Sequence, residues 1–99
     1  MFGTTIRKLR EEKGLLLRQV AAELDIDTAL LSKIERGNRG LKKEQVFKLA
    51  KIFDCPTKNL IVLWLSDKIM ELVKDEYYAL DTLNLTIDRL KIENRKKTE

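Results

Sequence analysis

Apolar and polar residues alternate along the first two-thirds of the chain with the three- and four-residue spacing of amphipathic α-helices. Glycines and the one proline separate the apolar stripes, where helices commonly end or begin. Thr4 or Thr5 is expected to cap the first helix, and Gly14 to end it. The pattern predicts an all-α fold with helices over residues 4–13, 17–24, 28–36 and 43–53, and a fifth from Pro56 to about residue 74.

The last third of the chain predicts one more helix, from about residue 75 to the mid-90s, with Tyr77 and Tyr78 packing at its start. Its apolar residues are spaced three, four and three apart, which is a heptad-like seam. A short helix is marginal alone in water, so this stripe must be buried on its own domain or on a second subunit. We favour a second subunit. The stripe consists of Val73, Leu80, Leu83, Ile87 and Leu90.

This pattern divides the chain into two parts. Residues 1–65 are expected to form the main domain, and residues 66–99 a helical extension that dimerises. In the main domain, the helix over residues 43–53 is expected to face the core with Val46, Phe47, Leu49, Ala50 and Phe53. The predicted dimer interface consists of Leu60, Trp64, Leu80, Leu83, Ile87 and Leu90.

Composition narrows the possible functions. The chain has 99 residues, a net charge of +4 and a sequence pI near 9.3, which permits a polyanionic partner. It contains no histidine and one cysteine, Cys55, so a catalytic His–Cys pair and an internal disulfide are excluded, and a reducing cytosol is expected. No secretory segment is visible, and the longest apolar run, residues 60–65, is too short to span a membrane. We expect neither an enzyme nor a cofactor.

Residues 15–37 carry the strongest local pattern. Two short helices joined by a three-residue turn require a small residue where they cross, which Ala21 supplies, and a residue that tolerates left-handed backbone, which is Asp25. Ile26 would fill the corner. The pattern is typical of helix pairs that bind DNA, but a helical hairpin that does not bind DNA could share it. The shared core is expected to contain Val20, Leu24, Leu31 and Ile34.

These residues resemble the helix-turn-helix of the Cro and phage-repressor family, also called the XRE family. The resemblance covers residues 6–64 and rests on IRKLREEKGL, QVAAEL, SKIERG and EQVFKLAKIFD. It implies a repressor-like five-helix domain with an extra C-terminal helix. Within the family, ERGNRGL is similar to controller proteins of restriction-modification systems. The chain departs from the family at Leu16 and Leu17, where a polar cap and a glutamine usually stand, so a stabilising cap and a phosphate contact are lost.

The resemblance implies that the helix over residues 28–36 lies in the major groove of an operator. Arg39, just beyond that helix, is the favoured contact, because its guanidinium can hold guanine or phosphate with two hydrogen bonds. Several alternatives stay open: Thr28 as a helix cap, Ser32 bonded to its own helix, and Lys33 as a phosphate contact. The DNA-contact candidates are Arg18, Thr28, Ala29, Ser32, Lys33, Arg36, Asn38, Arg39, Lys42 and Lys43.

The same resemblance implies a scaffold salt bridge between Arg10 and Glu35. The predicted function is therefore a homodimeric, sequence-specific regulator of transcription that binds double-stranded DNA. The similarity of ERGNRGL to controller proteins implies a role in a restriction-modification operon. The alternative is an antitoxin-like module that binds another protein through its C-terminal helices. Neither a small-molecule ligand nor a membrane is expected as a partner.

Overall fold

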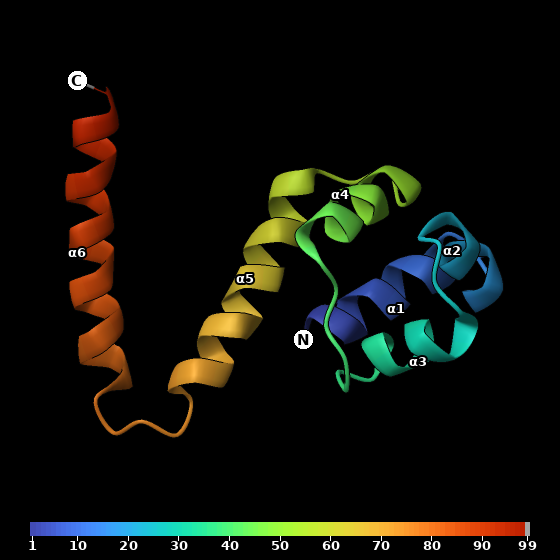
Figure 1. The fold of residues 1–99 in the computed structure, drawn as a ribbon, viewed down its shortest axis with the longest axis horizontal. Coiled ribbons are helices and arrows are strands. Elements are labelled where there is room, and N and C mark those ends of the chain that lie inside the picture. The colour runs from blue at the N-terminus through green and yellow to red at the C-terminus, as the bar shows by residue number, and fades with distance from the viewer. Residues whose placement is uncertain (99) are drawn as a thin grey trace. The chain divides into compact units, whose positions relative to one another are not determined.

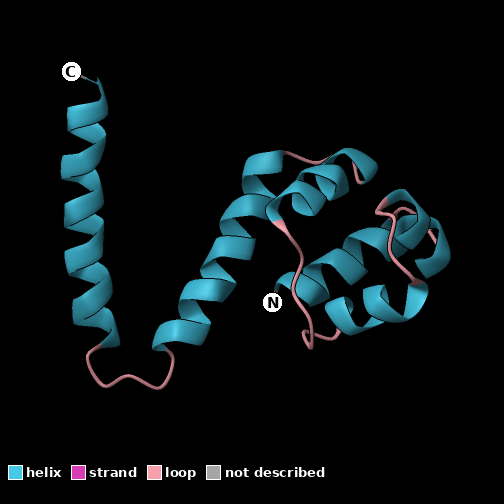
Figure 2. Ribbon diagram, viewed as in Figure 1, coloured by secondary structure: helices cyan, strands magenta, loops and turns pink. Residues whose placement is uncertain are grey.

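The computed structural model describes residues 1–98, and over that range it contains helices and no strands (Figures 1 and 2). The predicted all-α fold is confirmed. The chain divides into two compact units, Met1–Lys68 and a second unit that begins at Ile69. The helices are α1 (Phe2–Glu12), α2 (Leu17–Glu23), α3 (Thr28–Glu35), α4 (Lys43–Ile52), α5 (Thr57–Val73) and α6 (Ala79–Thr98).

The core of the first unit is built from one face of each helix. α3 packs against α1 and α2, and α2 packs against α4. The predicted core residues of the α2–α3 pair are all buried. Phe47 is a wrong prediction, because 43% of it is exposed. At 100° per residue, a helix that buries Val46, Leu49, Ala50 and Phe53 turns residue 47 toward solvent.

Helix α1 begins at Phe2, earlier than the sequence pattern indicated. Thr4 and Thr5 are not its caps: their hydroxyl groups donate to the carbonyl oxygen of Met1, at 3.0 and 2.8 Å. Instead, the Phe2 N–H donates to the Asp67 Oδ2 of α5, at 2.8 Å. A tertiary contact therefore satisfies one of the free N–H groups of the first turn, and nothing in the local sequence signals it.

The turn residues behave as predicted. Gly14 has a φ of 67° and ends α1, and Gly37 has a φ of 82° just after α3. Asp25 adopts a φ of 57° in the α2–α3 turn. This left-handed conformation is uncommon for a residue other than glycine, and aspartate is among those that tolerate it best.

The last helix starts later than expected. Residues 74–78 form a turn, and α6 begins at Ala79. Tyr77 and Tyr78 are therefore not packing residues at a helix start. Tyr77 is 91% exposed, and the two rings contact each other edge to face, with centroids 4.8 Å apart. Val73 ends α5 and is buried, so it does not continue the α6 stripe.

Among the described residues, no helix is long and apolar enough to cross a membrane.

Candidate nucleic-acid interface

The α2–turn–α3 segment forms a helix-turn-helix, and its cap decides which side chains are available at the start of α3. The Asp27 Oδ1 accepts a 2.6 Å hydrogen bond from the Leu30 N–H, so Asp27 is the N-cap. Thr28 is therefore not the cap, and it lies exposed in the first turn. The carboxylate is held by the helix, and the threonine hydroxyl is left for another partner.

The outward face of α3 carries short polar and basic side chains. Thr28, Ala29 and Lys33 are exposed and Ser32 is half-buried, whereas Leu31, Ile34 and Glu35 are buried. At 100° per residue, all the contact candidates from 28 to 36 fall in one sector of about 140°. Arg36 is partly engaged, because its Nε donates to the Ser32 carbonyl oxygen at 3.3 Å.

The loop after α3, residues 37–42, is here called the reading loop. It turns at Gly37, whose N–H donates to the Ile34 carbonyl, and the Asn38 N–H donates to that of Lys33. Asn38, Arg39 and Lys42 are exposed, and Lys43 follows at the first position of α4. In the described part of the chain, no salt bridge involves the basic candidates Arg18, Lys33, Arg36, Arg39, Lys42 and Lys43.

The start of α2 compensates in part for its missing cap. Leu16 occupies the N-cap position and cannot accept a hydrogen bond through its side chain. The Gln19 Oε1 accepts from the Leu16 N–H at 2.8 Å, which satisfies one backbone donor. Sequence reasoning missed this contact, although a glutamine three residues after the cap position is its signal. Arg18, in the same turn, is exposed.

The predicted bridge between Arg10 and Glu35 is confirmed, and it ties the C-terminal end of α3 to α1. The Arg10 Nε and Nη2 atoms lie 2.7 and 3.1 Å from the two Glu35 carboxylate oxygens. The Arg10 Nη1 also donates to the Leu15 carbonyl at 2.9 Å. Hydrogen bonding to Glu35 raises the pKa of Arg10 above its usual value. The pair therefore holds α3 in place immediately before the reading loop.

The net positive charge of the chain lies in the first unit. Residues 1–68 hold 14 lysines and arginines against 9 aspartates and glutamates, a net charge of +5. The remaining residues of the sequence carry a net charge of −1. A basic excess confined to the helix-turn-helix unit favours a polyanionic partner there.

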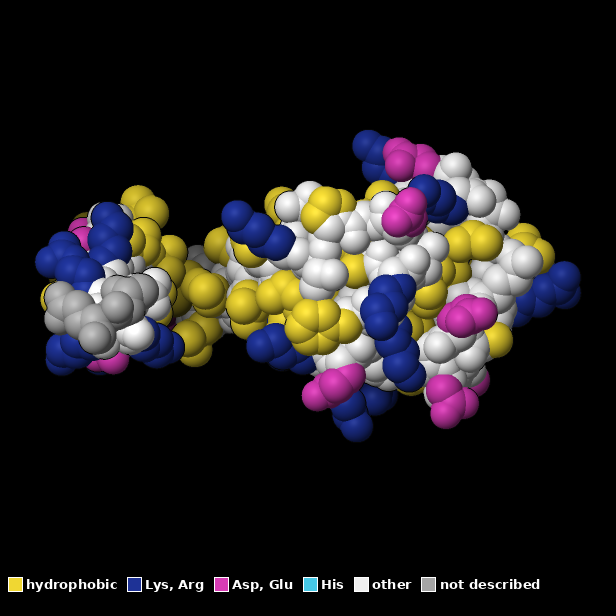
Figure 3. All heavy atoms as spheres, turned by 90° about the horizontal axis from the view of Figure 1, so that it is seen from above, with side chains coloured by type: hydrophobic (Ala, Val, Ile, Leu, Met, Phe, Trp, Pro, Cys, Tyr) yellow, Lys and Arg dark blue, Asp and Glu magenta, His cyan; other side chains and the backbone are white. Residues whose placement is uncertain are grey.

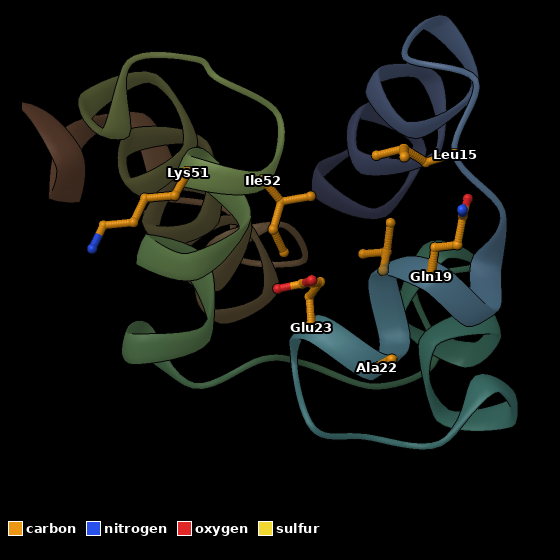
Figure 4. A pocket seen from close by; sticks show the side chains of 7 residues that line it. Leu15, Gln19, Ala22, Glu23, Lys51 and Ile52 are labelled. Carbon is orange, nitrogen blue, oxygen red and sulfur yellow. The ribbon is translucent and has the colours of Figure 1, made fainter.

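A separate depression lies between α2 and α4 (Figure 4). It is open, has a volume of about 650 Å³, and contains none of the DNA-contact candidates. In Figure 4, Ile52 points into it and Lys51 points away. It is lined by Leu15, Gln19, Val20, Ala22, Glu23, Lys51 and Ile52.

Within residues 1–98, Cys55 and the acidic side chains do not gather into a metal or catalytic site. Cys55 is half-buried, and burial raises the pKa of its thiol, which makes it a poor nucleophile. Over residues 1–98, no cluster of three or more cysteine, aspartate or glutamate side chains is placed to hold a metal ion.

Of the residues predicted to form the dimer interface, the structure buries one and leaves the others half-buried or exposed. Leu60 is 2% exposed and belongs to the core of the first unit, so it cannot reach a second subunit, and that prediction is wrong. Trp64 is half-buried, and Leu80, Ile87 and Leu90 are exposed on α6, with Leu83 half-buried. Figure 3 shows apolar side chains gathered on the surface where α5 lies. Leu85 and Ile92 are also exposed, on the other side of α6, and the predicted heptad-like seam does not include them.

Comparisons with known proteins agree with this geometry. A family model described as helix-turn-helix, HTH_3, matches residues 6–60. Two proteins of Bacillus subtilis (strain 168) are similar over 61 residues, or 61% of this chain. HTH-type transcriptional regulator RghRB is 39% identical, with 44% of its length covered, and HTH-type transcriptional repressor RghR is 38% identical, with 45% covered. The match thus spans less than half of either relative.

One solved structure shares the fold over the whole chain. It is described as a SinR protein/SinI protein complex, and it superposes with a TM-score of 0.55, at 18% sequence identity and full coverage of both chains. At that identity, the likeness concerns the fold alone.

Proposed function

The chain belongs to the HTH_3 helix-turn-helix family of DNA-binding, non-enzymatic transcriptional regulators, and on this premise we propose that it reads a specific operator as a homodimer. The observation that carries the proposal is the exposed face of α3, with its short polar side chains, next to a basic reading loop that forms no ion pair within the described residues.

Base reading is assigned to α3. Short hydroxyl side chains at Thr28 and Ser32 can donate or accept at base edges, and the Ala29 methyl suits a thymine methyl. Lys33 can donate to O6 and N7 of guanine. Arg39, on the reading loop, can hold a guanine edge or a phosphate with two parallel hydrogen bonds.

Phosphate binding is assigned to groups that flank α3. Arg18 lies near the start of α2, and Asn38, Lys42 and Lys43 lie on or beside the reading loop. Each phosphate contact releases bound counterions, so affinity falls with salt, and each contact removed lowers the log–log slope by about 1.

Dimerisation is assigned to the apolar side chains that the single chain leaves exposed. On α6 the seam of Leu80, Ile87 and Leu90 faces water, and on α5 Val62 and Leu65 do the same. An isolated helix with an exposed stripe is marginal, and a second copy would cover it. A symmetric dimer would also place two recognition helices on successive turns of DNA, about 34 Å apart.

Selection of duplexes from a random-sequence library by the full-length protein tests the assignment. The expected product is an inverted repeat with half-sites about 10 base pairs apart, one helical turn. Lys33→Ala should return a different consensus, whereas the control Lys58→Ala, an exposed lysine of α5, should return the parent consensus. Failure to enrich any sequence would contradict sequence-specific reading, and an unchanged consensus would reduce Lys33 to a phosphate contact.

A protein partner is the second candidate, and the two apolar sides of α6 favour it. Leu85 and Ile92 lie away from the seam, so one symmetric contact leaves them uncovered. The solved structure with the shared fold is, by its description, a complex of two different proteins. Solution mass separates the two: a tight homodimer favours self-association, and a monomer at micromolar concentration favours another protein.

The restriction-modification role and the cytosolic location stay predictions. The first rests on the ERGNRGL segment alone, and neither relative named above carries such a description. Methyltransferase and endonuclease genes beside this one would support it.

A further inference from the structure

Trp64 is the only tryptophan of the chain, and it lies on α5, outside the helix-turn-helix. Its indole Nε1–H donates a 3.1 Å hydrogen bond to the backbone carbonyl oxygen of Leu41. Leu41 lies in the reading loop, between Arg39 and Lys42. A side chain of α5 therefore holds the backbone of the loop to which we assign DNA contacts.

This bond is the one that fixes the middle of the reading loop. The loop begins with hydrogen bonds from Gly37 and Asn38 to α3, and it ends with the Lys42 N–H donating to the Gln45 Oε1 at 2.8 Å. Among the hydrogen bonds of the described residues, only that from Trp64 reaches residues 39–41. The buried side chain of Leu41 adds an apolar anchor at the same place.

The donor is itself held in position. The Trp64 ring is half-buried against the core of the first unit. The Lys68 ammonium lies over the ring, 4.5 Å from its centroid, which is a cation–π contact. A half-buried indole with a cation over its ring has few orientations, so its N–H stays directed at the loop.

We propose that Trp64 is a positioning residue for DNA binding, which orders the reading loop before the DNA arrives. The proposal rests on the proposed function, because it assigns Arg39 to DNA. A mobile loop must lose conformational entropy when it binds, and a loop that is already ordered loses less. Trp64 thereby contributes to DNA affinity without touching DNA.

Amide exchange in the full chain, measured by NMR without DNA, tests the anchoring. Trp64→Phe keeps an aromatic ring and deletes the donor, and it should speed exchange at Asn38 and Lys42, the hydrogen-bonded amides on either side of the anchor, while α1, α2 and α3 keep their protection. The comparison variant is Lys68→Met, which removes the cation over the ring and leaves the bond to Leu41; it should change loop exchange less than Trp64→Phe does. Faster exchange throughout the unit in Trp64→Phe, no change in the loop, or an equal loop effect in Lys68→Met would overturn the proposal.

Binding to the duplex selected by the parent protein tests the consequence. Trp64→Phe should weaken binding by about 3- to 10-fold, the equivalent of one net hydrogen bond. In an Arg39→Ala background the same substitution should cost clearly less than in the parent, because the favoured contact that the loop positions is gone and only those of Asn38 and Lys42 remain on the loop. Additive effects would overturn the proposal. If Arg39→Ala alone leaves binding intact, the assignment of Arg39 fails, while the exchange experiment still decides whether Trp64 orders the loop.

A measurement on the parent protein covers the case in which Trp64→Phe does not fold. The single indole N–H gives one isolated NMR signal. Its exchange with solvent should be slow and should slow further when the selected duplex is added. Fast exchange that is insensitive to the duplex would overturn the proposal.

Discussion

Arg39 is exposed two residues beyond Gly37, on a backbone that the structure holds at both ends and through Leu41. A guanidinium in this place can form two parallel hydrogen bonds with guanine or phosphate. Arg39→Ala should weaken operator binding by about 1–3 kcal/mol, the usual value of one such contact. Electrophoretic titration at fixed salt measures it, and an affinity equal to that of the parent would contradict the assignment.

Glu35 is the one buried charged residue among those the structure describes, and its environment sets its role in stability. Its side chain is 5% exposed and that of Arg10 is 12% exposed. Glu35→Ala leaves the arginine without its carboxylate, which should lower the free energy of unfolding by about 2–4 kcal/mol, near the range for a broken buried pair. Urea denaturation followed by circular dichroism gives the value.

A second arginine–glutamate pair on α1 offers the matched control. Arg7 and Glu11 are also 2.7 Å apart, but their side chains are 63% and 55% exposed. Glu11→Ala should therefore change stability by no more than about 0.5 kcal/mol. Equal losses in the two variants would mean that burial is not what makes the Arg10–Glu35 pair important.

At the scale of helices, α1 and α3 approach each other closely at Gly3. Gly3 is buried inside α1, and a Cβ at this position would lie within 3.0 Å of the carbonyl oxygens of Ile34 and Glu35. Both obstacles are backbone atoms, so a larger residue forces the helices apart. The close packing of α1 on α3 thus depends on a glycine that helix propensity alone would disfavour.

Gly3→Ala should destabilise the protein by about 1–3 kcal/mol, as overpacked cores do, although alanine is the better helix former. Gly40→Ala is the control, since a Cβ there would meet nothing within 4 Å and should stay within about 0.5 kcal/mol of the parent. Thermal melting compares the two variants. A stabilised Gly3→Ala would show that α1 can shift without loss.

At the scale of the molecule, the exposed seam of α6 is the main feature that one chain leaves uncovered. Removal of residues 76–99 should weaken the dimer and, through it, operator binding. In a symmetric dimer each subunit supplies the same surface, so the truncation removes both sides of the α6 contact. Sedimentation over a concentration series compares the truncated chain with the full one. Equal dissociation constants would move the interface to the apolar surface of α5.

A pair of substitutions separates the two sides of α6 in the full chain. Ile87→Lys places a charge on the seam, and Leu85→Lys places one on the opposite side. If the seam forms the dimer, only Ile87→Lys dissociates it. Dissociation by Leu85→Lys alone would assign the interface to the other side of the helix.

The sequence determined the helices, the turn and the outward face of α3. Periodicity fixes which residues of a helix share a face, and Gly14, Asp25 and Gly37 mark ends through their own backbone preferences. The family resemblance also predicts the salt bridge between Arg10 and Glu35. All of these depend on local pattern or on a known motif.

Tertiary structure decided what depends on contacts between distant segments. The start of α1 is satisfied by Asp67, 65 residues away, and the reading loop is held by Trp64, 23 residues beyond Leu41. Leu60, predicted to lie at the dimer interface, is buried in the core, and Phe47, predicted to lie in the core, is exposed. The packing direction of a helix is set by its neighbours. The end of α5 was predicted to within a residue, but no glycine or proline marks the turn at residues 74–78, so the late start of α6 at Ala79 could not be predicted from the sequence. Local spacing carries no information about which distant group satisfies a hydrogen bond or covers a face, and only the folded chain supplies it.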